Sequence, residues 1–123
     1  MLGVMAFFSV HQKALGQNVS ARQPGPHLAS QALVNPLELT KENLSLGRGV
    51  FYRMCVTCHG MDGKGQTDTA RAPTVKPSDF TLGKFRYGQS DGELFTLIQS
   101  GTPNGMAAYK DLLEEDQIWQ LVF

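Results

Sequence analysis

The sequence has few of the features that identify several common classes of protein. Among its 123 residues are two cysteines, one tryptophan and three histidines, and eleven basic residues balance eleven acidic ones. A net charge of zero gives no reason to expect nucleic acid or an anionic membrane surface as a partner. Strand-like segments are also scarce, and the apolar run from Leu2 to Val10 is far too short for a transmembrane helix. The composition therefore predicts one small, mainly helical domain with tails.

Both cysteines lie in one short segment, Cys55-Val56-Thr57-Cys58-His59. This spacing is the attachment pattern of a c-type haem, because two thiols three positions apart can reach both vinyl groups of one porphyrin edge. The histidine that follows stands over the ring face, where an imidazole nitrogen can bind the iron. The pattern predicts one covalent haem c, bound through Cys55 and Cys58, with His59 as an axial ligand.

Two other interpretations of a Cys-x-x-Cys pair are a redox disulfide and half of a zinc site. A thioredoxin-like motif would open a helix after a strand, and strand patterns are few here. A structural zinc site needs two more Cys or His ligands at matching spacing. Only His11 and His27 remain, in a stretch rich in proline, glycine and glutamine. The glycines at 60, 63 and 65 predict a tight loop, because no strand precedes them as a nucleotide-binding loop requires.

The apolar pattern predicts three helices. The first begins at Thr40 as N-cap and runs into the first cysteine, with Gly47 on its buried face. The second opens with a capping box from Ser90 to Glu93 and ends at Ser100-Gly101. The third covers residues 112–123, where apolar side chains recur at helical spacing.

The candidate for the sixth iron ligand is Met106. It lies in a loop between two predicted helices, well beyond His59, so it can cross to the far side of a porphyrin. Met61 is too close to His59 to do so, Met54 lies on a buried helix face, and the other two methionines are in the apolar N-terminus. A thioether ligand favours ferrous iron. The alternative role of Met106 is that of core filler.

The N-terminal 38 residues are expected to lie outside the domain. Residues 1–16 hold the apolar run, which has the length of a signal-peptide core and is followed by small residues at Ala14-Leu15-Gly16. No basic residue precedes the run, so a docking segment buried by a membrane or a partner subunit is the other interpretation. Residues 17–38 are predicted to be an extended linker, and simple disorder is the alternative. Residues 39–123 form the predicted domain.

Residues 39–123 resemble a class I monohaem cytochrome c of the bacterial type. The segments that carry the resemblance are Gly47 to Gly60, Asp91 to Phe95, Gly105-Met106, and Glu115-Asp116 leading into Ile118-Trp119. The resemblance implies an all-α class I cytochrome c fold, with three principal helices around one covalent haem. It also implies that Gly47 and Phe51 pack against the C-terminal helix around Ile118, Trp119 and Val122.

The resemblance further implies a hydrogen-bond partner for the proximal histidine. In this family a proline carbonyl after the attachment site accepts from the other ring nitrogen. Pro73 is the candidate in this chain, and Pro77 is the alternative. The sequence departs from the family pattern at Ala107, where a proline usually follows the methionine ligand.

The expected function is single-electron transfer between redox proteins rather than enzymatic catalysis. With His59 and Met106 on the iron, no open position remains for substrate chemistry, so neither a small-molecule substrate nor nucleic acid is expected. Two more basic than acidic residues between positions 61 and 88 could steer an acidic partner, and an ordinary solvated surface is the alternative.

The first hypothesis is a subunit of a membrane-associated respiratory or photosynthetic complex, in the periplasm or on the outer face of the cytoplasmic membrane. The chain is similar in size and motif to the monohaem cytochrome subunit of the quinol-oxidising alternative complex III. The alternative is a freely diffusing periplasmic electron shuttle. A third hypothesis is a haem sensor or a peroxidase-like enzyme, in which Met106 leaves the iron or never binds it.

Overall fold

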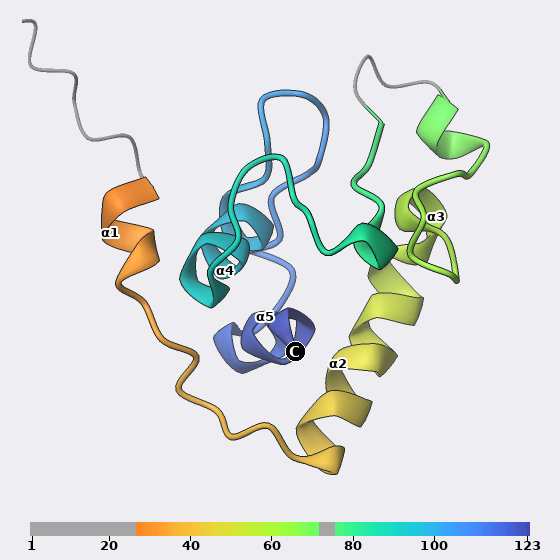
Figure 1. The fold of residues 1–123 in the computed structure, drawn as a ribbon. Helices are drawn as coiled ribbons and strands as arrows, with labels where there is room; N and C mark the ends of the chain where they lie inside the picture. Colours follow the sequence, from red (N-terminus) through yellow and green to blue (C-terminus); the bar gives the residue numbers. More distant parts are fainter. Residues whose placement is uncertain (1–26, 72–75) are drawn as a thin grey trace, which may run out of the picture.

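The computed structural model describes residues 27–71 and 76–123 (Figure 1). Within these two ranges the secondary structure is helical and no strand is present, so the predicted all-α class is confirmed. None of the helices in these ranges has the length and apolar content to cross a bilayer. The α-helices are α1 (His27–Gln31), α2 (Lys41–Met54), α3 (Val56–His59), α4 (Asp91–Ser100) and α5 (Glu115–Val122), with 3-10 turns η1 (Thr69–Arg71) and η2 (Phe80–Leu82).

Helices α2 and α4 begin at the predicted caps. The Thr40 hydroxyl accepts a hydrogen bond from the Asn43 amide at 3.1 Å. The Ser90 hydroxyl accepts from the Glu93 amide at 3.3 Å, and the Glu93 carboxylate accepts from the Ser90 amide at 3.0 Å, which completes the capping box. These bonds satisfy amides that have no partner inside the helix. Helix α4 ends at Gly101, as predicted.

Helices α2 and α5 cross with their backbones in contact. A Cβ atom on Gly47 would lie 2.0 Å from the carbonyl oxygen of Gln120 and 2.6 Å from its carbonyl carbon. No residue with a side chain fits at this point without moving one of the helices. The contact falls on Gln120, inside the 118–122 stretch that the family resemblance implied. The Gln120 side chain also donates to Asn43 Oδ1 at 3.1 Å.

The apolar core lies between α4 and α5 and extends to α2. The Phe95 and Trp119 rings stack with their centroids 3.9 Å apart and their planes 15° from parallel. Ile118 and Val50 are the most deeply buried of the large apolar side chains, at 1% and 2% exposure. Burying one such side chain stabilises the fold by about 1.5–3 kcal/mol. This core holds α2, and with it the attachment turn at its end, in a fixed place.

The third predicted helix begins later than expected. The amides of Leu112 and Leu113 both donate to the Tyr109 carbonyl at 2.9 Å, so this stretch is a turn rather than helix. Helix α5 starts at Glu115, after the Glu114 amide donates to the Gln117 side chain at 2.9 Å. The shift follows from this local hydrogen bonding, which helical periodicity alone does not show.

The prediction of an extended linker is wrong for the residues His27–Gln31, which form helix α1. Ser30 is buried, and its carbonyl oxygen would lie 2.0 Å from a Cβ on Gly92, so α1 packs closely on α4. Gln31 donates to Glu93 at 2.9 Å, and Asn35 donates to the Trp119 carbonyl at 3.1 Å. These contacts with the domain stabilise a helix too short to form alone. The predicted N-terminal segment 1–16 lies outside the described residues.

Candidate functional site

The two cysteines lie where α2 gives way to α3. The Cys55 carbonyl accepts from the amides of Cys58 and His59 at 3.2 and 2.9 Å, which makes one tight turn of the segment. Both thiols are free, Cys55 half-buried and Cys58 exposed. Burial, helped by the neighbouring Cys58, raises the pKa of the Cys55 thiol to about 11, so this thiol keeps its proton at neutral pH. The turn presents two thiols able to form thioethers.

His59 ends α3 and is half-buried. Its Nδ1 atom is buried and makes no hydrogen bond within the described structure. Burial lowers the pKa of the imidazole, and the nearby backbone of Ser78 opposes this effect only in part. The lowered pKa keeps the ring neutral at neutral pH, which is the form that binds a metal.

A tight glycine-rich loop follows the histidine, as the sequence predicted. The Gly65 amide donates to the His59 carbonyl at 2.8 Å, which folds the loop back onto α3. The Thr67 hydroxyl donates to the Thr57 carbonyl at 2.8 Å and so fixes the end of the loop to the attachment turn. Gly65 has a φ of +66°, and a Cβ there would lie 2.8 Å from the Pro77 carbonyl oxygen. The loop therefore carries the 76–80 segment against the histidine.

The segment next to His59 supplies Ser78 and Phe80. The backbone of Ser78 interacts with the imidazole, and the Phe80 ring stacks on it with centroids 4.7 Å apart. The Pro77 carbonyl, the alternative to Pro73 as the partner of the histidine, lies instead against Gly65. Pro73 itself lies outside the described residues, so its role stays a prediction.

Met106 lies in a loop folded back on the end of α4. Its amide donates to the Thr102 hydroxyl at 3.1 Å, and its carbonyl accepts from the Thr102 amide at 2.9 Å. The side chain of Asn104, in the same loop, donates to the Tyr87 hydroxyl. Met106 is half-buried. These hydrogen bonds fix the backbone of Met106 within the chain itself, as preorganisation of a binding residue requires.

Tyr109 joins the methionine segment to the attachment turn. Its hydroxyl donates to the Met54 carbonyl at 3.2 Å, and its amide donates to the Ile98 carbonyl at 3.1 Å. Burial and the two nearby cysteine thiols raise the pKa of this phenol. Two parts of the predicted site that lie about fifty residues apart along the chain are therefore neighbours in space.

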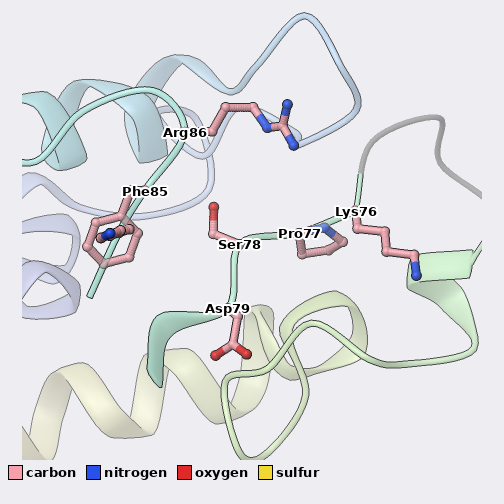
Figure 2. A pocket seen from close by; sticks show the side chains of 7 residues that line it. Lys76, Pro77, Ser78, Asp79, Phe85 and Arg86 are labelled. Carbon is pink, nitrogen blue, oxygen red and sulfur yellow. The ribbon is translucent and has the colours of Figure 1, made fainter. Parts of the chain in front are cut away.

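A cavity of about 410 Å³ borders the same site (Figure 2). Figure 2 shows Ser78 in the middle of its wall, with Arg86 on one side and Asp79 on the other. The Asp79 carboxylate is hydrogen-bonded within its own turn. One of its oxygens accepts from both the amide and the hydroxyl of Thr81, at 2.9 and 2.6 Å. Three cationic side chains of the wall make no ion pair or hydrogen bond within the described parts of the chain: Lys76, Lys84 and Arg86. The wall reaches the histidine through Ser78, and positive charge in this cavity suits a group that carries carboxylates.

Comparison with known proteins places this arrangement in a family. Residues 42–122, which include all of α2 but its first residue, then α3 to α5, the attachment turn and the Met106 loop, match the family described as cytochrome c oxidase, cbb3-type, subunit III. The chain belongs to this family. The predicted class I cytochrome c fold and haem-based electron transfer are thereby confirmed.

Two solved structures are also similar to the chain. One belongs to the Kuenenia stuttgartiensis reducing HAO-like protein complex Kustc0457/Kustc0458, with 28% identity and a TM-score of 0.66. The match covers 75% of this chain and only 45% of that one, so the chain spans less than half the length of this relative. The other is the KustC0563 c-type cytochrome, with 26% identity over 62% of this chain and 88% of that chain, and a TM-score of 0.48.

The residues of the site fit a covalent haem c. Two free thiols stand three positions apart on one turn, and a neutral imidazole with an unpartnered, buried nitrogen follows at once. Cys55, Cys58 and His59 would hold the group, and the cations of the cavity suit its carboxylates. The sequence did not reveal the roles of Phe80 and Tyr109. The Phe80–His59 stack and the Tyr109–Met54 hydrogen bond both join residues too far apart in sequence for a local pattern to show.

Proposed function

We propose that this chain carries single electrons through one haem c bound at Cys55 and Cys58, with His59 and Met106 as the axial ligands of the iron. The observation that carries the proposal is the Tyr109–Met54 hydrogen bond, which brings the methionine segment beside the attachment turn. The bound group supplies reversible one-electron change between ferric and ferrous iron. Two thioethers would keep it from dissociating between reactions.

The chain's own residues hold both ligands with little freedom. The two Thr102–Met106 hydrogen bonds fix the methionine backbone, and α3 fixes the backbone of His59. The lowered pKa of His59 keeps its nitrogen lone pair free for the iron at neutral pH. Ligands that need not rearrange between the two redox states keep the barrier to electron transfer low.

We also propose that the chain is a subunit of a membrane-associated electron-transport complex, in the periplasm or on the outer face of the cytoplasmic membrane. Support comes from the relative with a TM-score of 0.66, which is itself part of a redox protein complex. A native gel of solubilised membranes stained for haem tests this: a large band containing the chain is expected, and a small soluble band would make it a shuttle.

The ligand assignment is tested by replacing Met106 with alanine in the haem-loaded protein. We expect the covalent haem to remain, the low-spin ferric spectrum to be lost and the midpoint potential to fall, because thioether ligation favours ferrous iron. Met61→Ala is the matched control, since Met61 is 71% exposed and should leave spectrum and potential unchanged. A wild-type ferric protein that is already high-spin and binds cyanide rapidly would show that Met106 is no ligand, and would favour the sensor or peroxidase-like function.

A further inference from the structure

The imidazole of His59 stacks on an aromatic ring from a distant part of the chain. The centroids of the His59 and Phe80 rings are 4.7 Å apart, and their planes differ by 22°. Such a near-parallel pair at this separation is attractive and resists rotation of either ring out of the common plane. The Phe80 ring therefore covers one face of the imidazole and restricts its rotation.

Phe80 is itself held from several directions. Its amide donates to the Gly63 carbonyl at 2.9 Å, and a Cβ on Gly63 would lie 3.3 Å from the Phe80 ring. On its other sides the ring meets Phe51 and Phe85, with centroids 6.1 and 5.7 Å away. Because these neighbours come from α2, from the glycine loop and from the segment after η2, the ring is fixed to the frame of the domain rather than to a loose end.

Within the described residues, hydrogen bonding does not fully fix the orientation of the imidazole. Nδ1 makes no hydrogen bond within the described residues, and the Ser78 backbone is the other group of the 76–80 segment that acts on the ring. Helix α3 fixes the backbone of His59 but not rotation of the ring about its Cβ–Cγ bond, which is a broad torsion for histidine.

We propose that Phe80 is a positioning residue that sets the plane of the His59 imidazole and thereby the direction of the proximal ligand field at the iron. This rests on the proposed function, in which His59 is an axial ligand. The plane of the imidazole decides which iron d orbital its π system meets. Phe80 therefore fixes the orientation of the unpaired electron in the ferric protein without touching the iron.

The test compares three variants of the haem-loaded ferric protein by frozen-solution electron paramagnetic resonance and by the hyperfine-shifted haem methyl resonances. Phe80→Leu keeps apolar bulk but removes the stack, so we expect a shifted or broadened largest g value and a changed order of the methyl resonances. Phe80→Tyr keeps the ring, and its hydroxyl can reach water because Phe80 is 37% exposed, so it should retain the wild-type spectra. Tyr52→Leu removes a ring that meets Phe51, with centroids 6.2 Å apart, and is one ring further from Phe80, so it should also retain them.

The outcomes separate the proposal from the ligand assignment on which it rests. If the wild-type spectra show that no histidine binds the iron, the proposed function itself is contradicted. If the wild type shows histidine ligation and the Phe80→Leu variant gives the same spectra as the wild type, only the role of Phe80 is overturned. If Phe80→Leu does not yield haem-loaded protein, cross-relaxation between the ring protons of Phe80 and His59 in the ferrous wild type decides: its presence supports the stack, and its absence overturns the proposal.

Discussion

The crossing of α2 and α5 and the layer that surrounds His59 are built in different ways. At the crossing, Gly47 meets the Gln120 backbone directly, and the neighbouring Val50 and Ile118 are almost fully buried. Around His59 and Met106 the chain is mostly loop, and the side chains of Phe80 and Met106 are exposed and half-buried. The first region has no room for adjustment, whereas the second is held by single hydrogen bonds and ring contacts.

Because of this difference, we expect changes at the crossing to affect stability and changes around His59 to affect the geometry of the proposed ligands. Close backbone packing cannot be relieved by a change of rotamer, so a change at the crossing should act on the free energy of unfolding of the whole domain. A change around His59 and Met106 removes one or two weak contacts, so it should act mainly on the placement of these two proposed ligands. Substitutions that add one methyl group in each region test this division.

The largest effect on stability is expected for Gly47→Ala. The added Cβ would lie within 2.6 Å of two backbone atoms of Gln120, so the helices must separate. Overpacking of this kind costs about 3 kcal/mol or more where no flexible side chain can move aside. Denaturant unfolding of the haem-loaded protein measures the loss.

Gly49→Ala provides the control on the same helix. A Cβ there meets only the end of the Arg53 side chain, at 3.4 Å, which can move aside. Alanine is a better helix former than glycine by about 1 kcal/mol, so this variant should be as stable as the wild type or slightly more stable. Equal losses for the two variants would show that the α2–α5 contact does not limit stability.

A smaller loss of stability with a larger effect on the ligand is expected for Gly101→Ala. Gly101 has a φ of +72°, and a Cβ there would lie 2.5 Å from the Met106 carbonyl oxygen. We expect a loss of about 2 kcal/mol, together with faster cyanide binding because the methionine loop is displaced. Gly83→Ala, with a φ of +59° and nothing within 4 Å, should lose about 1 kcal/mol and bind cyanide as the wild type does. Wild-type cyanide binding by both variants would contradict this account.

The features that the sequence predicted well depend on residues close together in the chain. The caps at Thr40 and Ser90 each involve a hydroxyl and an amide three residues away, so a short pattern contains the whole interaction. The turn from Cys55 to His59 is equally local, because its chemistry depends on spacing alone. Gly47 was found for a different reason: a glycine on the buried face of a helix is costly unless another backbone approaches it.

The features that the sequence did not predict depend on contacts between distant segments. The docking of α1 needs Gly92 on α4 to leave space for the Ser30 carbonyl, which no pattern within residues 17–38 can show. The stack of Phe80 on His59 depends on a glycine loop that folds the 76–80 segment back. Sequence reasoning therefore identified the candidate ligands of the site more readily than the residues that pack around them.

The smallest effect is expected at Glu93, in the capping box at the start of α4. Hydrogen bonds from the amides of Gln89 and Ser90, and from the Gln31 side chain, lower the pKa of its carboxyl to about 2. Because the pKa in the folded state is below that of the unfolded chain, ionised Glu93 favours folding above the ordinary glutamate pKa. That contribution is lost as the pH falls toward about 2.

Glu93→Gln should therefore lower the thermal unfolding midpoint slightly at pH 7, and the difference should disappear near pH 2. The effect stays small because glutamine can also complete a capping box and because the carboxylate is exposed to water. Glu42→Gln, in the first turn of α2, is the matched control without a capping box. Titration of the Glu93 carboxyl by NMR gives the direct measurement. A normal glutamate pKa there would mean that the contacts from α1 and the cap do not hold the charge in solution, and that α1 is not fixed to α4 by this bond.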